Sequence, residues 1–76
     1  MADAEIRMEV IRGLIEQIRP ILAGHPPGVQ GAVLADLQAI WAAGHPPQMR
    51  ERLLEFHLDA VRKLIVPNAK IMGTGV

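Results

Sequence analysis

Apolar and polar residues alternate with a helical period along three stretches of the chain. Over residues 4–23 and 47–66, apolar side chains fill an arc of roughly 200° on a helical wheel, with charged residues opposite. Residues 27–43 carry a single charge, Asp36. The pattern predicts three helices and an all-α fold. Small residues also recur along the middle stretch and indicate either a ridge for close helix approach or a simple exposed face: Gly31, Ala35, Ala39 and Ala43.

A repeated pentapeptide separates these helices. Ala-Gly-His-Pro-Pro occupies residues 23–27 and again residues 43–47. In each copy the glycine, Gly24 or Gly44, suits the left-handed conformation that ends a helix, and the prolines suit the first turn of the next helix. The two copies indicate either a duplication or two tight turns of the same kind. The turn chemistry alone explains them, which favours the second interpretation.

Pro67 marks the expected end of the last helix, because proline disfavours helical geometry at the residue before it, Val66. The residues that follow show no periodicity. We therefore expect a compact three-helix domain over residues 1–67. Residues 68–76 are predicted to form a flexible tail or a segment that docks on a neighbour.

The predicted helices carry more apolar surface than one small core uses. A helix that covers a single core needs an apolar stripe only slightly wider than about 100°, and half of the 76 residues are apolar. Monomers rarely expose large apolar patches, and two-fold homodimers are the commonest assemblies, so we predict an obligate homodimer. Trp41 is the expected anchor, because buried aromatic side chains dominate interface energetics. The predicted interface residues are Leu34, Leu37, Trp41, Leu54, Leu58, Val61 and Ile65.

Composition and charge narrow the functional classes. The chain has 8 basic residues, 8 acidic residues and no cysteine, which excludes a disulfide scaffold and a cysteine-based zinc finger. A net charge of zero removes the basic surface expected of a nucleic-acid-binding protein. The acidic first residues do not resemble a signal peptide, and prolines and glycines break the longest uncharged run. We therefore expect a soluble, cytoplasmic protein that does not bind membranes.

Three histidines are the main candidates for chemistry: His25, His45 and His57. No two of them share a helical face, and His25 and His45 follow predicted helix ends, where capping explains them better than metal binding. The only hydroxyl side chain is that of Thr74, and no phosphate-binding loop or strand-to-helix elbow is present. We predict no catalytic residue, no metal site and no cofactor.

Asp36 and His57 fall on the apolar faces of their helices rather than opposite them. A buried imidazole needs a hydrogen-bond partner, so these two residues form a candidate polar core pair. Such a pair is either a satisfied structural contact or a pH-sensitive or ligand-contacting dyad. The structural interpretation is favoured, because most buried polar groups have that role.

Together these features predict a helix-mediated protein–protein interaction module: an adaptor, a regulator or an accessory subunit. Its expected partners are a second copy of the chain and another protein bound through the helices at residues 27–43 and 47–66. One alternative is a small DNA-binding regulator of the helix-turn-helix type. Acidic residues balance the arginines of its recognition helix, which disfavours that alternative. The other is a helical dimer with a ligand or catalytic pocket around His57 and Asp36.

Overall fold

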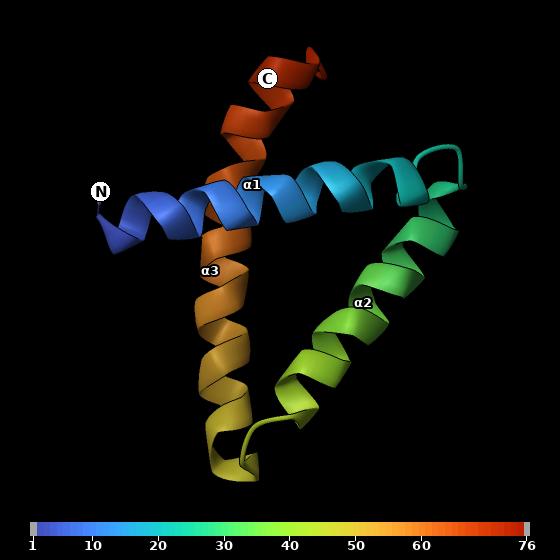
Figure 1. The fold of residues 1–76 in the computed structure, drawn as a ribbon. Helices are drawn as coiled ribbons and strands as arrows, with labels where there is room; N and C mark the ends of the chain where they lie inside the picture. Colours follow the sequence, from blue (N-terminus) through green and yellow to red (C-terminus); the bar gives the residue numbers. More distant parts are fainter. Residues whose placement is uncertain (1, 76) are drawn as a thin grey trace. The chain divides into compact units, whose positions relative to one another are not determined.

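The structure is a computed structural model that describes residues 2–75 and consists of three α-helices (Figure 1). Helix α1 spans Asp3–Leu22, α2 spans Pro27–Ala43 and α3 spans Pro47–Met72. Helix accounts for 85% of the described chain, and that part contains no strand. The all-α, three-helix prediction is therefore confirmed. No helix in the described part of the chain combines the length and the apolar character needed to cross a membrane.

The chain divides into two units, and the boundary between them falls inside α2. The first unit, Met1–Leu34, contains α1 and the beginning of α2. The second unit, Ala35–Val76, contains the rest of α2 and all of α3. Most of the predicted interface residues therefore belong to the second unit, while Leu34 belongs to the first.

The turn between α1 and α2 gives a partner to the last carbonyl group of α1. Gly24 has a φ of 85°, the left-handed conformation expected of a helix-ending glycine. The backbone N–H of His25 donates to the Leu22 carbonyl at 3.3 Å, and the Gln30 side-chain amide donates to the same oxygen at 2.8 Å. Pro27 then begins α2, in the position where its missing N–H has no consequence.

The turn between α2 and α3 also gives hydrogen-bond partners to the last carbonyl groups of α2, but its backbone geometry is different. The last four carbonyls of a helix have no partner inside it. Here the Gly44 N–H donates to Ile40 O at 3.1 Å and the His45 N–H donates to Ala42 O at 3.0 Å. His45 Nδ1 lies 2.8 Å from Trp41 O, which makes this ring a cap, as expected. Gly44 has no positive φ, so the prediction of a left-handed glycine is confirmed at the first turn and wrong at the second.

Arg50 completes this turn from the first part of α3. Its Nη2 donates to Ala43 O at 3.1 Å, and its Nε donates to His45 O at 3.0 Å. With these bonds, each of the last four carbonyls of α2 has a hydrogen-bond partner. The guanidinium group therefore fixes the start of α3 against the end of α2.

Helix α3 continues past Pro67 to Met72, so the expected helix end at Val66 is wrong. Proline removes only one backbone donor from a helix and disturbs the preceding turn. The carbonyl that loses its usual backbone donor is that of Lys63, four residues before the proline. The side-chain amide of Asn68 donates to the next carbonyl, Leu64 O, at 2.8 Å. The helix goes on for five residues after the proline.

The end of α3 is set by Gly73, which adopts the left-handed conformation with a φ of 69°. The Gly73 N–H lies 3.4 Å from Lys70 O, and the Thr74 N–H donates to Ala69 O at 3.0 Å. These two bonds form a Schellman motif, the usual way in which a helix ends on glycine. The predicted tail over residues 68–76 therefore begins inside α3. Its proposed docking role stays a prediction, and its last residue lies outside the described part.

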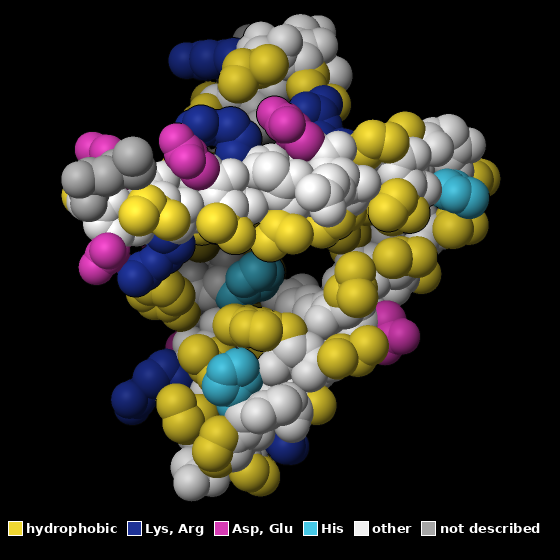
Figure 2. Space-filling view, in the orientation of Figure 1, with side chains coloured by type: hydrophobic (Ala, Val, Ile, Leu, Met, Phe, Trp, Pro, Cys, Tyr) yellow, Lys and Arg dark blue, Asp and Glu magenta, His cyan; other side chains and the backbone are white. Residues whose placement is uncertain are grey.

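Apolar side chains remain exposed along every helix (Figure 2). Within residues 2–75, Ala42 is the one buried residue, with 6% of its surface exposed. Most large apolar side chains of α1, α2 and α3 keep 40% or more of their surface exposed, whereas Leu22, Leu53 and Leu54 are half-buried. The apolar excess seen in the sequence is thus present as accessible surface.

Candidate interaction surface

The second unit joins the end of α2 to α3 through an aromatic cluster. The Trp41 ring lies 5.2 Å from the His57 ring between centroids, tilted by 42°. Its centroid is 5.5 Å from that of His45, in an edge-to-face arrangement at 70°. Aromatic rings prefer such offset geometries at separations of about 4.5–7 Å. Trp41 is therefore held on its own chain by α3 and by the turn, and 42% of it still faces solvent.

The structure gives His57 a different neighbour from the one that the sequence suggested. His57 is half-buried and contacts Trp41, whereas Asp36 is exposed on α2. In the part of the chain that the structure describes, no hydrogen bond or ion pair joins Asp36 to His57. The ion pair recorded there joins Lys63 to Asp59 at 2.9 Å, four residues apart on α3. The candidate polar pair is not formed within one chain.

A groove of about 410 Å³ runs between α2 and α3 on another side of this unit. Its α2 wall consists mainly of alanines, whose short side chains leave the space open. Its α3 wall carries two carboxylates, from Glu51 and Glu55, beside apolar side chains. The lining residues are Ala35, Gln38, Ala39, Ala42, Glu51, Leu54, Glu55 and Leu58.

The predicted interface residues keep part of their surface accessible in the single chain. Leu54 is half-buried where α2 and α3 meet, and the other six are at least 40% exposed. Leu54 and Leu58 line the groove. A shallower depression of about 260 Å³ continues along α3 and is lined by Val61, Leu64, Ile65 and Asn68. The surface thus extends along α3 beyond the end of the groove.

Gln30 and Arg50 are structural residues that the sequence interpretation missed. They occupy equivalent places in the repeat, each three residues after the second proline of its pentapeptide. Each side chain reaches back to the carbonyl groups that end the preceding helix. The sequence contained a signal for this role, because two residues with long side chains that can donate hydrogen bonds occur 20 residues apart, at the same place in each copy. The two copies therefore share a side-chain hydrogen bond to the end of the preceding helix as well as their residue identities.

Residues 2–75 contain no group of three or more histidine, aspartate or glutamate side chains placed to hold a metal ion. The chain matches no protein-family model, no curated protein sequence and no solved structure. The exposed apolar surface of α2 and α3 is the main candidate for a functional site in the described residues.

Proposed function

We propose that this protein is a helix-mediated interaction module that works as a homodimer. The observation that carries the proposal is the exposure of large apolar side chains along α2 and α3 while Ala42 alone is buried in the described chain. Monomeric proteins rarely leave contiguous apolar surface of this kind in water. A second copy is the partner that is always present at equal concentration, and two-fold pairs are the commonest assemblies.

Chain length supports the same proposal. A domain of about 60–80 residues with a single core gains only a few kcal/mol of stability, and oligomerisation is a usual remedy. This chain has 76 residues, no disulfide and no metal cluster in its described part. Burial of the exposed side chains of α2 and α3 between two copies supplies the missing core. A dimer of this kind serves as an adaptor, a regulator or an accessory subunit through the apolar surface that it leaves uncovered.

Sedimentation equilibrium over a micromolar concentration series tests the proposal, together with one pair of variants. Ile65→Glu places a charge at a position that is 57% exposed in the single chain, so the helix itself tolerates it. In an interface the same carboxylate is desolvated without a partner, so we expect a loss of dimer. Lys63→Gln is the matched control, because it changes the net charge by the same amount at an exposed position. A wild-type chain that is a stable, helical monomer at micromolar concentration would refute the proposal.

A further inference from the structure

Apolar residues on α3 follow the spacing of a coiled-coil seam. Successive members are four, three and four residues apart, the pattern that puts side chains on one line along a helix. Polar residues continue the series at both ends, with Glu51 before it and Asn68 after it. We refer to the four apolar members as the α3 seam: Leu54, Leu58, Val61 and Ile65. A second helix can pack along such a line by inserting its side chains between those of α3.

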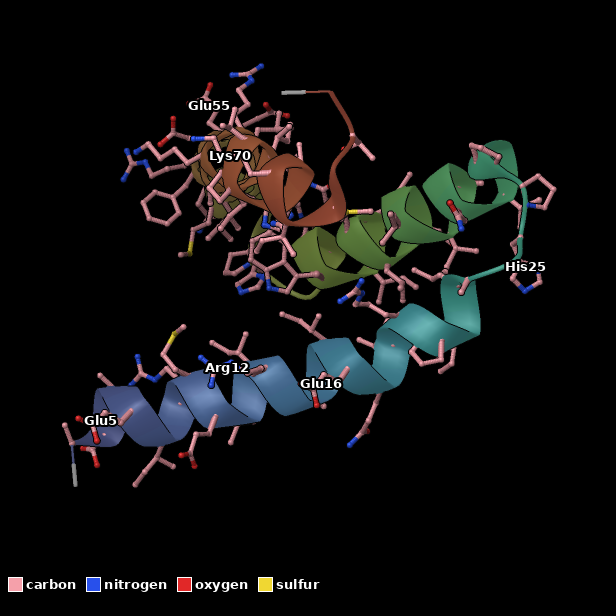
Figure 3. All side chains as sticks on the ribbon, turned by 90° about the horizontal axis from the view of Figure 1, so that it is seen from above. Glu5, Arg12, Glu16, His25, Glu55 and Lys70 are labelled. Atoms are coloured by element: carbon pink, nitrogen blue, oxygen red, sulfur yellow. The ribbon has the colours of Figure 1, made fainter. Side chains whose placement is uncertain are left out.

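One edge of the α3 seam is already occupied within the chain. On that edge Arg50 is hydrogen-bonded to the α2–α3 turn, and His57 packs on Trp41. The opposite edge carries Glu55 and Arg62, which are one heptad apart and of opposite charge. Figure 3 shows Glu55 projecting outward from α3. Residues 2–75 contain no ion pair or hydrogen bond made by either side chain.

The charges on the open edge determine which direction a partner helix takes. When two helices run antiparallel about a two-fold axis, each edge of a seam faces the same edge of the partner. When they run parallel, each edge faces the opposite one, which α2 and the turn cover here. Only the antiparallel arrangement brings Glu55 next to the partner's Arg62 and Arg62 next to the partner's Glu55. Charged residues at these edge positions set the orientation of coiled coils.

We propose that α3 pairs antiparallel with α3 of a second copy, and this inference rests on the proposed homodimer. The register follows from the seam: Leu58 packs against the partner's Val61, and Leu54 against the partner's Ile65. The same register places Glu51 opposite the partner's Asn68, so the apolar layers end in polar ones. The groove of about 410 Å³ lies on the Glu55 side of α3, where the short alanine side chains of α2 leave space that side chains of the partner helix can enter.

Charge reversal tests the pairing of the open edges. Glu55→Arg and Arg62→Glu each replace two attractive contacts by two repulsive ones in a symmetric dimer, so we expect each to raise the dimer Kd about tenfold at low salt. The double variant restores two attractive pairs and should return the Kd to within about threefold of wild type. Glu16→Arg is the control for Glu55→Arg, because it makes the same charge change at an exposed residue that is not a member of the seam or of its edges.

The outcomes of this cycle separate the two proposals. A wild-type monomer refutes the homodimer and the seam together. A wild-type dimer that neither reversal weakens refutes the antiparallel seam and leaves the homodimer standing. A double variant as weak as the single ones also refutes the seam, because the two residues then do not meet across the interface.

Disulfide trapping tests the direction and the register independently, because the chain has no cysteine of its own. In the proposed register, Leu54 and the partner's Leu54 are 11 residues apart along the axis, about 16 Å. A disulfide spans at most about 7 Å between Cα atoms, so Leu54→Cys alone should not cross-link. An equal mixture of Leu54→Cys and Ile65→Cys chains should cross-link rapidly. Cross-linking of Leu54→Cys with itself, without formation of the mixed product between the Leu54→Cys and Ile65→Cys chains, would overturn the antiparallel arrangement.

Discussion

Trp41→Ala removes the single tryptophan of the chain. We expect it to affect both the association of two copies and the stability of each copy. Trp41 is 42% exposed, while the rest of its surface contacts its own chain, including the rings of His45 and His57. The exposed part belongs to the predicted interface, and the covered part holds α2 against α3. The substitution should therefore weaken the dimer strongly and the single chain moderately.

The size of the first effect follows from the exposed area. A tryptophan buries up to about 250 Å², so 42% corresponds to about 100 Å² left for an interface. At about 25 cal/mol per Å², covering that area contributes about 2.5 kcal/mol per copy and about 5 kcal/mol per symmetric dimer. A change of this size raises the Kd by more than about a thousandfold. Within the chain, loss of two aromatic contacts lowers the free energy of unfolding by about 1–3 kcal/mol.

Two measurements distinguish these effects. Sedimentation equilibrium gives the dimer Kd, and circular dichroism during chemical denaturation gives the helix content and the stability of the chain. Trp41 is also an intrinsic probe in the wild type, because its fluorescence should shift to the red when dilution separates the copies. Phe56→Ala is the control: Phe56 is 78% exposed and lies outside the predicted interface, so its Kd should stay within about threefold of wild type. Unchanged Kd and native helicity in Trp41→Ala would refute the role of Trp41 as anchor.

Four further substitutions test the local structure. Gly24→Ala should lower the free energy of unfolding by about 1 kcal/mol, because Gly24 has a φ of 85°, whereas Gly44→Ala at the equivalent place should change it by less than about 0.5 kcal/mol. Equal losses in thermal denaturation would contradict the difference between the two turns. Arg50→Ala removes two hydrogen bonds to the α2–α3 turn and should cost about 1–2 kcal/mol in denaturant titration; no loss would show that these bonds are not needed. Pro67→Ala restores a backbone donor inside α3 and should raise both helicity and amide protection in its last turns; a decrease would contradict the continuous helix.

The helix boundaries show where sequence patterns are sufficient and where they mislead. The pentapeptide repeat predicted both turns because proline favours the first turn of a helix through its own backbone angle, with little help from distant residues. The glycine ends the helix in the left-handed conformation at Gly24 and not at Gly44. Pro67 was misread as a helix end because its cost is limited to one donor and one turn. The real stop, Gly73, was visible in the sequence with Lys70 in the turn before it. The helix ends at Gly73 because the turn there gives hydrogen-bond partners to the last carbonyl groups of α3.

For the candidate surface, too, one part was predictable from the sequence and another part was not. The apolar faces of α2 and α3 were predictable, because their residues recur with the helical period. The partner of His57 was not, because a helical wheel gives the direction of a side chain but not what another helix places in front of it. Trp41 and Asp36 point to different parts of the α2 circumference, and only the packing of α2 on α3 selected Trp41.

By itself, the sequence determined three helices, their order, the C-terminal ends of α1 and α2, and an excess of apolar surface. These properties depend on backbone preferences and on residue spacing within one element, which are local quantities. Only the tertiary structure decided that Arg50 donates hydrogen bonds to the α2–α3 turn and that Trp41 packs between His45 and His57. It also decided that these contacts occupy one edge of α3, while Glu55 and Arg62 on the other edge form no ion pair within residues 2–75. Those outcomes depend on which faces meet after the chain reverses, and that choice involves residues from different helices at once.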